Sequence, residues 1–210
     1  MRIVDSRIKP TFELEAAEYQ LGCWPIAGVD ESGRGPWAGP VVAAAVILDP
    51  ERIPANIDDC KALNEEARAY LYKRIMKVAA VSVAVADVAR IDRQNILGAT
   101  LWAMAQAVNK LSDMPKLILV DGNATPRLPM PARAIIKGDT KCLSIAAASI
   151  IAKVTRDRLM TDLAREYPGY GFERHKGYGT PEHQAAIAKL GVSPLHRRSF
   201  KPVQLALGLV

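Results

Sequence analysis

A membrane-spanning helix requires an apolar run of about 18 residues, and no run in this 210-residue sequence is that long. Residues 1–22 alternate charged and apolar side chains, and they lack the continuous apolar core of a signal peptide. Half of the residues are hydrophobic, which is enough for one domain of this length to bury its own core. We therefore expect a cytoplasmic monomer without membrane contact, folded as a single domain over residues 1–210.

Cysteine and histidine are scarce, with three of each. The cysteines are odd in number, far apart and without a Cys-x-x-Cys pair, so we expect reduced thiols and no disulfide framework. The histidines lack the spacing of zinc ligands, which argues against a zinc-dependent protein. The residues concerned are Cys23, Cys60, Cys142, His175, His183 and His196.

Acidic residues are sparse near the C-terminus. Between residues 153 and 201, ten Lys and Arg oppose five Asp and Glu, whereas the rest of the chain has eighteen against seventeen. This region is typical of a surface that binds a polyanion, and a solvated helix face without a partner has the same composition. We assign the basic surface to Lys153, Arg156, Arg158 and Arg165 on one helix and to a basic, extended tail at residues 196–203.

Short apolar runs alternate with segments of helical periodicity, which predicts an α/β fold. The predicted strands cover residues 26–29, 41–47, 81–86, 116–120 and 132–136. The predicted helices cover residues 10–21, 64–77, 92–110, 144–167 and 180–191, with Asn64, Asp92 and Thr180 as N-caps. The Gly- and Tyr-rich residues 168–178 read as a loop.

The segment GVDESGRGPWAGP, residues 28–40, joins the first two predicted strands and holds the most unusual residues of the chain. Neighbouring side chains on a strand point to opposite faces, so Asp30 and Glu31 can share one site only if the strand stops at Asp30. Two close carboxylates favour a hard cation between them, such as Mg²⁺ or Mn²⁺. An isolated Asp-Glu pair, in contrast, is more often a solvated hairpin turn.

Two further predicted strands also end in an aspartate. Asp121 follows residues 116–120 directly, and Asp139 follows residues 132–136 after two residues. Ligands of open α/β sheets gather at the carboxyl ends of strands. Asp30, Asp121 and Asp139 could therefore meet at one site.

In combination, these motifs resemble the bacterial type 2 ribonuclease H family, ribonuclease HII, over nearly the full length of the chain. The matching segments are GVDESGRGPWAGPVVAAAVIL, IDRQNILGATLWAM, VDGN, KGDTKCLSIAAASIIAKVTRDRLM, HKGYGTPEH and HRRSF. The resemblance implies a ribonuclease H-like fold, with a mixed central sheet flanked by helices and a C-terminal helical and loop region. In the segment DCKAL, Cys60 and Ala62 stand where the family usually has Ser and Lys.

The resemblance also implies a function and a set of site residues. The substrate would be an RNA–DNA hybrid or duplex DNA with an embedded ribonucleotide, cut on the 5′ side of the ribonucleotide with Mn²⁺ or Mg²⁺ as cofactor. The four catalytic, metal-binding positions fall on Asp30, Glu31, Asp121 and Asp139. The substrate-binding positions fall on Gly33, Arg34, Gly35 and Tyr178, with Lys61, Asn95 and Lys153 as further candidates, and on the basic region of about residues 153–201.

Two other functions compete with this interpretation. A non-catalytic nucleic-acid-binding relative would keep the basic region without turnover. Another metal-dependent nuclease or strand-transfer enzyme of the same broad fold would not need the Gly33-Arg34-Gly35 loop and Tyr178. Cleavage of a hybrid with and without a chelator distinguishes the first alternative, and cleavage of an all-DNA duplex distinguishes the second.

Overall fold

A mixed five-stranded sheet lies at the centre of the computed structural model, which describes residues 9–210. The strand order is β3-β2-β1-β4-β5. The β1–β2 and β2–β3 pairs are antiparallel, and the β1–β4 and β4–β5 pairs are parallel. The strands are β1 (Ile26–Ser32), β2 (Val41–Ile47), β3 (Ala80–Ala86), β4 (Leu117–Asp121) and β5 (Ala132–Ile135). The predicted mixed sheet is confirmed. The prediction that residues 1–22 are not a signal peptide falls partly on residues 1–8, outside the described residues.

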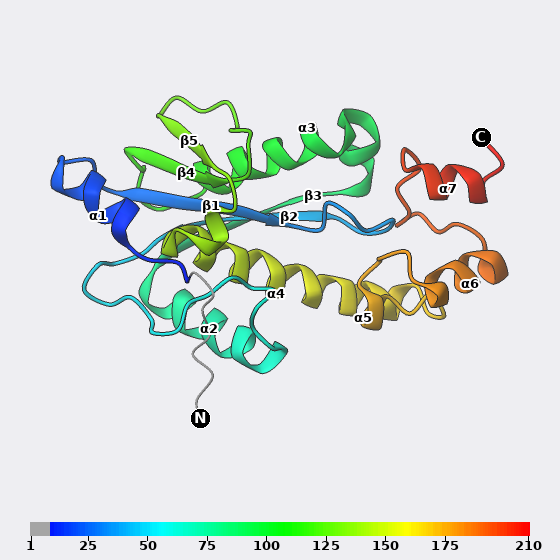
Figure 1. Cartoon of the computed structure of the whole chain (residues 1–210). Coiled ribbons are helices and arrows are strands. Elements are labelled where there is room, and N and C mark those ends of the chain that lie inside the picture. Colours follow the sequence, from blue (N-terminus) through cyan, green and yellow to red (C-terminus); the bar gives the residue numbers. More distant parts are fainter. Residues whose placement is uncertain (1–8) are drawn as a thin grey trace.

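Helices cover both faces of the sheet (Figure 1). Helix α3 lies on one face, and α4 lies on the other with α2 beside it. The helices are α1 (Glu13–Gln20), α2 (Glu65–Val78), α3 (Val88–Asn109), α4 (Leu143–Glu166), α5 (Phe172–His175), α6 (Pro181–Leu190) and α7 (Lys201–Ala206), with a 3₁₀ turn η1 (Gly138–Thr140). Over residues 9–210, no helix combines the length and the apolar character needed to cross a bilayer.

The side chains of β2 divide the core into two layers. Val41, Ala43 and Ala45 pack in the cluster that contains the buried residues of α3, whereas Ala44 and Val46 pack in the cluster that contains those of α4. Successive residues of a strand point to opposite faces, so this alternation follows from the strand geometry. All seven residues of β2 are buried, as expected for a strand covered by helices on both sides.

Helix α4 lies close to the sheet because both surfaces carry small residues. Ala146 and Ala147 are fully buried, and Gly28 of β1 faces the backbone of Ser144 so closely that a Cβ atom would overlap it. The start of α4 is stabilised by α1, because the buried carboxylate of Glu15 accepts a hydrogen bond from the Ser144 amide at 2.8 Å.

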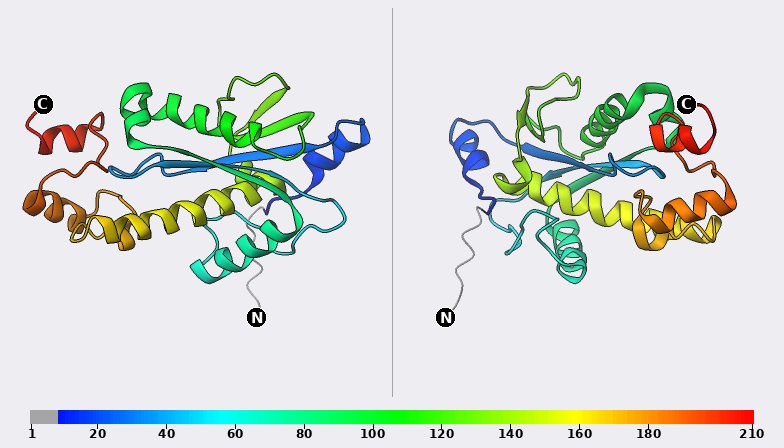
Figure 2. Two further views of the ribbon diagram at one scale, coloured as in Figure 1. Left: turned by 180° about the vertical axis from the view of Figure 1, so that it is seen from behind. Right: turned by 45° about the vertical axis from the view of Figure 1, so that its right-hand side comes forward.

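The C-terminal region extends beyond the end of the sheet (Figure 2). A separate apolar cluster that includes Met160 and Phe172 joins it to the end of α4. Two predictions need correction here. Residues 168–178 are not all loop, because α5 lies within them, and the tail at residues 196–203 is not extended throughout, because α7 begins at Lys201.

Two of the three predicted N-caps are confirmed. The side chains of Asn64 and Thr180 accept hydrogen bonds from the backbone of α2 and α6. The prediction for Asp92 is wrong, because α3 begins earlier and is capped by Asp87. Asp92 instead accepts hydrogen bonds from the amides of Arg198 and Ser199, and so ties the C-terminal region to α3.

We expect Gly28→Ala to destabilise the fold by about 1–3 kcal/mol, the usual cost of overpacking, because the new methyl group would push α4 away from β1. Gly98→Ala is the matched control, since Gly98 lies in α3 and its Cβ would meet only side-chain atoms, of Gln94 at 3.3 Å and Asn95 at 3.9 Å. Chemical denaturation of both variants measures the difference. Equal stability of Gly28→Ala and the unsubstituted protein would contradict the close packing described here.

Candidate active site

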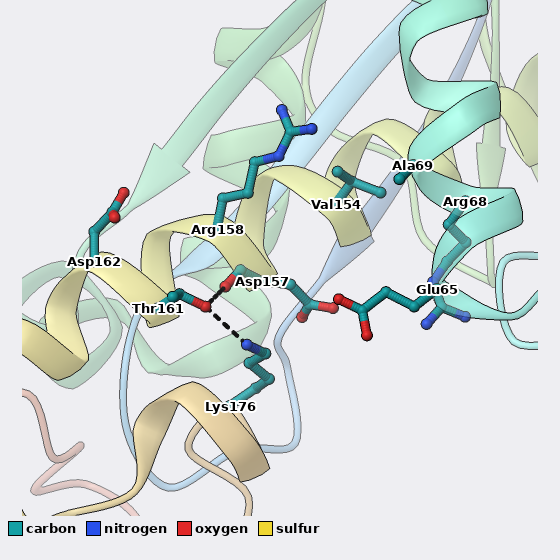
Figure 3. A pocket seen from close by; sticks show the side chains of 9 residues that line it. All are labelled: Glu65, Arg68, Ala69, Val154, Asp157, Arg158, Thr161, Asp162 and Lys176. Carbon is teal, nitrogen blue, oxygen red and sulfur yellow. Dashed lines mark hydrogen bonds between the residues drawn. The ribbon is translucent and has the colours of Figure 1, made fainter.

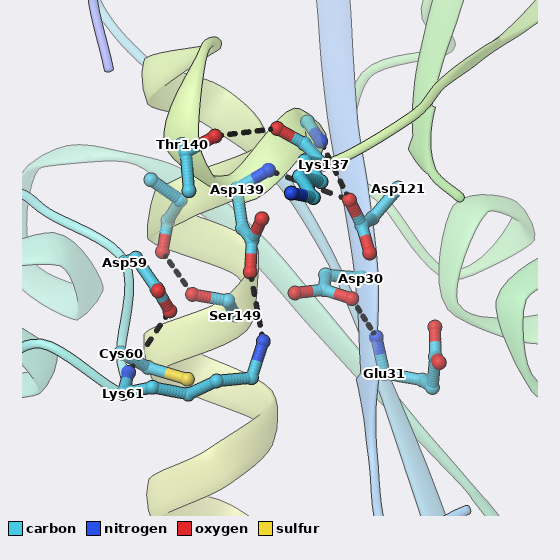
Figure 4. Close-up of polar contacts among 12 residues, drawn as sticks. Asp30, Glu31, Asp59, Cys60, Lys61, Asp121, Lys137, Asp139, Thr140 and Ser149 are labelled. Atoms are coloured by element: carbon cyan, nitrogen blue, oxygen red, sulfur yellow. Dashed lines mark hydrogen bonds and ion pairs between the residues drawn. The ribbon is translucent and has the colours of Figure 1, made fainter. Parts of the chain in front are cut away.

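Three aspartates converge on the side of the sheet that α4 covers (Figure 4). Asp30 lies in β1, Asp121 ends β4, and Asp139 lies in η1 after β5. One carboxylate oxygen of each lies within 4.8 Å of those of the other two, and Asp30 and Asp139 are buried. Among residues 9–210, this is the one group of acidic, histidine or cysteine side chains arranged to hold a metal ion.

Glu31, the fourth predicted acid, is not in this group. The prediction that the strand stops at Asp30 is wrong: β1 continues to Ser32, and Glu31 pairs with Ala43 of β2. Its side chain therefore points to the face of α3, where it lines a small hollow together with Asp121. Figure 4 shows its carboxylate turned away from that of Asp30. Glu31 also lines the cleft that contains Asp30, so it reaches the site from its edge, beside Asp121.

Burial and neighbouring negative charge make Asp30 and Asp121 harder to ionise. The pKa of Asp30 lies well above its usual range because the group is buried and because Glu31, Asp121 and Asp139 add negative charge. Burial and the charge of Asp139 also raise the pKa of Asp121. Hard oxygen ligands with unrelieved negative charge fit a divalent cation, which would favour the ionised form of each carboxylate.

Neighbouring groups of the protein offset part of this negative charge. Asp121 accepts hydrogen bonds from the amides of Gly138, at 2.7 Å, and Asp139, at 3.4 Å. The ammonium group of Lys61 lies 3.1 Å from a carboxylate oxygen of Asp139. Cys60, the residue before Lys61, is not in the acidic group, and burial raises the pKa of its thiol to about 11.

A cleft of about 300 Å³ opens beside the acids. Most of the predicted substrate-binding residues line it: Gly33, Arg34, Gly35, Lys61, Lys153 and Tyr178. The half-exposed ring of Tyr178 faces Gly35, whose Cβ would lie 3.6 Å from it. The two segments are far apart in sequence, so the fold brings together the loop and the tyrosine that the family resemblance assigns to substrate binding.

Asn95 is not among the residues that line this cleft. It has a left-handed backbone conformation, with φ of 57°, and it interrupts the helical geometry of α3. Its side-chain oxygen accepts hydrogen bonds from the amides of Leu97 and Gly98 and so caps the second part of the helix. A local structural role accounts for this oxygen, and substrate binding by Asn95 stays a prediction.

The predicted basic surface is smaller than its sequence indicated. Arg156 is 1% exposed and Arg197 is fully buried, so neither can reach a ligand from the surface. Burial lowers the pKa of Arg197 to about 9 and that of Arg156 to about 10, and both stay protonated at neutral pH. Lys153 is paired with Asp157 at 2.7 Å, whereas Arg158 and Arg165 are exposed as predicted.

A second hollow of about 380 Å³ lies between α2 and α4 (Figure 3). Arg68 lines both this hollow and the acidic cleft, so the two adjoin. Arg68, Arg158 and Lys176 supply positive charge, and the residues that oppose them are Glu65, Asp157 and Asp162. The mixed charge makes this hollow a weaker anion site than the composition of residues 153–201 predicts.

Comparison with known proteins identifies the family. A family model described as Ribonuclease HII matches residues 27–203. The chain belongs to the ribonuclease HII family. Ribonuclease HII from Rhodopseudomonas palustris strain BisB18 is 57% identical over 197 residues, which cover 94% of this chain and 74% of that relative. Its counterpart from Nitrobacter hamburgensis is 55% identical over 199 residues, which cover 95% and 74%.

Solved structures agree with this assignment. Ribonuclease H2 from Pyrococcus horikoshii OT3 has a TM-score of 0.72 at 27% identity, covering 86% of this chain and 96% of the other. The ribonuclease HII of the PCNA:RNase HII complex from Archaeoglobus fulgidus has a TM-score of 0.71 at 26% identity, covering 85% and 96%. As a ribonuclease HII, the protein is a divalent-metal-dependent endonuclease that acts on RNA–DNA hybrids.

The positions of several residues around the site could not be predicted from the sequence. The two buried arginines are predicted at the surface because a sequence does not show which side of a helix or turn is covered.

The three histidines, though far apart in sequence, gather behind Tyr178. The Nδ1 atom of His183 lies 2.9 Å from the Tyr178 carbonyl oxygen, and its Nε2 atom lies 3.0 Å from Nε2 of His196. Burial lowers the pKa of His196 to about 4, which keeps it neutral at physiological pH.

We expect Asp30→Asn to lower turnover of an RNA–DNA hybrid by at least about 1,000-fold, because the substitution removes one of the three carboxylates that could hold a metal ion. In EDTA at neutral pH, the same variant should be more stable than the unsubstituted protein. A carboxyl whose pKa is higher in the folded state makes that state less stable as pH rises from the ordinary value of 3.8 through the raised one.

Hybrid cleavage and thermal unfolding with EDTA, from pH 4 to pH 8, measure both effects. The stability gained by Asp30→Asn should shrink as pH falls. Asp162→Asn is the control, because Asp162 is an exposed acid on α4. Retained turnover, or a variant less stable than the unsubstituted protein at neutral pH, would contradict the assignment.

Proposed function

We propose that the protein cuts duplex DNA on the 5′ side of an embedded ribonucleotide, as well as RNA–DNA hybrids, and leaves 3′-hydroxyl and 5′-phosphate ends. The observation that carries this proposal is the convergence of Asp30, Asp121 and Asp139 beside the cleft that Gly35 and Tyr178 line. The acids supply a site for hydrolysis of a phosphodiester, and the neighbouring loop supplies backbone groups for recognition of a ribose.

The carboxylates would hold two divalent ions, Mg²⁺ or Mn²⁺. When bound, such a pair activates a water molecule and stabilises the charge on the leaving 3′ oxygen. Asp30 would be a ligand to both ions, since it lies between the other two acids. Asp139 would hold the ion that activates the attacking water, and Asp121 would hold the ion that stabilises the leaving group. Glu31 joins Asp121 there, because both line the hollow on the face of α3.

Recognition of the ribonucleotide depends on its 2′-hydroxyl, the group that distinguishes RNA from DNA at a given position. The backbone of Gly33-Arg34-Gly35 can bond this group without reading the base. Tyr178 lies beside Gly35 in the cleft and would pack on the neighbouring sugar. Lys61 and Lys153 line the same cleft and support the bound phosphates.

The chain would act as a single-domain monomer, in which residues of about 153–201 bind the duplex. Arg158, Arg165, Arg198 and Lys201 are exposed there and can contact phosphates. Such contacts are insensitive to base sequence and weaken with rising salt. Arg156 and Arg197 belong to the same region but are buried, so they cannot make such contacts.

We expect cleavage of a DNA duplex that carries one ribonucleotide, with a single cut on its 5′ side, in the presence of Mg²⁺ or Mn²⁺ and not of EDTA. Denaturing electrophoresis of end-labelled strands maps the cut, and an all-DNA duplex of the same sequence is the control. Binding without any cleavage would favour a non-catalytic relative. Equal cleavage of the all-DNA duplex would favour a nuclease without ribose recognition.

We expect Tyr178→Ala to lower kcat/KM on the single-ribonucleotide duplex by about 10–100-fold, the size of one lost stacking contact. Stability should change little, because the side chain is 48% exposed. Tyr70→Ala is the matched control, since Tyr70 is a tyrosine on α2 that is 61% exposed. An unchanged kcat/KM for Tyr178→Ala would remove this residue from the substrate site.

A further inference from the structure

Two buried guanidinium groups lie behind the Gly33-Arg34-Gly35 loop. Arg156 and Arg197 are among the largest fully buried side chains of the protein. Within residues 9–210, neither forms an ion pair with a carboxylate. A buried cation is costly unless its donors are satisfied, so the partners of these groups define what they do.

The partners of Arg197 are backbone carbonyl groups of the loop. Its guanidinium donates to the carbonyl oxygens of Gly33 at 2.6 Å, Arg34 at 3.0 Å, Gly39 at 2.9 Å and Pro40 at 3.3 Å. Its amide also donates to the Trp37 carbonyl oxygen, at 2.8 Å. One side chain therefore holds both ends of the turn that connects β1 to β2.

These bonds fix the direction of the amides of the loop. In a planar trans peptide, the C=O and N–H groups point in opposite directions. Because the carbonyl groups of Gly33 and Arg34 point inward to Arg197, the N–H groups of Arg34 and Gly35 point away from it. No residue in the range 9–210 accepts a hydrogen bond from either N–H group. Both residues are exposed and line the cleft.

The second guanidinium supports the other part of the turn. Arg156 donates to the carbonyl oxygens of Pro40 at 2.9 Å and Ala38 at 3.3 Å, and it makes no hydrogen bond to Gly33 or Arg34. It also packs behind Gly33, whose φ of 100° and lack of a Cβ atom leave room for it. Arg156 is thus a comparable buried cation that does not hold the carbonyl groups opposite the two free amides.

We propose that Arg197 is a positioning residue for ribonucleotide recognition, which holds the amides of Arg34 and Gly35 in place to donate to the oxygen of a 2′-hydroxyl. This inference rests on the proposed function, which assigns that loop to the ribose. The positive charge behind the loop adds to the effect, because it favours an electronegative oxygen on the opposite side of the same peptides. Lysine cannot replace it, since one ammonium group lacks the planar fork that spans four carbonyl groups.

Arg197→Lys tests the inference. We expect kcat/KM on a single-ribonucleotide duplex to fall about tenfold or more, the effect of misplaced hydrogen bonds, while Kd for an all-DNA duplex stays within about twofold. In Ca²⁺, fluorescence anisotropy should show that the unsubstituted enzyme prefers the ribonucleotide duplex and that Arg197→Lys binds the two duplexes equally. A merely structural loss would weaken both to the same degree.

Arg156→Lys is the matched control, because it removes a similarly buried guanidinium and leaves Arg197 on its carbonyl groups. It should lose stability and keep the preference for the ribonucleotide duplex. If Arg197→Lys also keeps that preference, the inference is overturned and the proposed function stands. If the unsubstituted enzyme binds both duplexes equally, ribose recognition by the loop fails, and the inference fails with it.

Hydrogen exchange of the unsubstituted enzyme tests the inference without any variant. The amides of Arg34 and Gly35 should exchange rapidly in the free protein and more slowly with the ribonucleotide duplex than with the all-DNA duplex. Protection of these amides in the free protein would show that they donate to an internal acceptor. The inference would then be wrong, whether or not Arg197→Lys folds.

Discussion

The mutual repulsion of three clustered carboxylates, two of them buried, is the constraint on which the rest of this structure depends. Asp30, Asp121 and Asp139 have oxygens within 4.8 Å of one another, in surroundings that raise the pKa of the first two. Folding alone does not favour such a group, and only a rigid support keeps it together. Two strands and a short 3₁₀ turn provide that support, and backbone amides together with Lys61 offset part of the charge. What remains is the attraction for divalent cations that a ribonuclease HII uses.

A second charge arrangement lies on the other side of the cleft. The loop between β1 and β2 has its carbonyl groups turned toward two buried guanidiniums and its exposed amides turned toward the cleft. The acids can therefore attract cations, and under the proposed function the loop amides would face an electronegative atom of the substrate. This division suits a substrate whose phosphate must meet metal ions while its ribose hydroxyl is read by donors a few ångströms away.

Much of the fold and the meeting of the three aspartates could be predicted from the sequence, because they depend on short, local sequence patterns. Apolar runs ending in Gly, Pro or Asp predicted the five strands, and the order of the motifs indicated the family. That Asp30, Asp121 and Asp139 would meet followed from their places at strand ends. The position of Glu31 could not be predicted in this way, since β1 continues by two residues and the strand period turns its side chain to the other face.

The burial of Arg156 and Arg197 could not be predicted from the sequence for a different reason. Arg156 lies on a helix between Lys153 and the exposed Arg158, and Arg197 lies in a basic pentapeptide. The composition of these segments therefore predicts a surface position for both arginines. Their burial depends on a turn about 160 residues from Arg197 that presents its carbonyl groups there. Long-range backbone contacts of this kind leave no periodic pattern in the sequence. The same applies to the three histidines that gather behind Tyr178.

A crystal structure of the enzyme in Mn²⁺, with anomalous scattering to locate the ions, tests the central claim most directly. The account predicts two ions about 4 Å apart, with Asp30 bonded to both, Asp139 to one and Asp121 to the other. It also predicts that Glu31 reaches the ion held by Asp121 from the edge of the site. Anomalous peaks away from these aspartates, or a single ion that Asp30 does not contact, would contradict it.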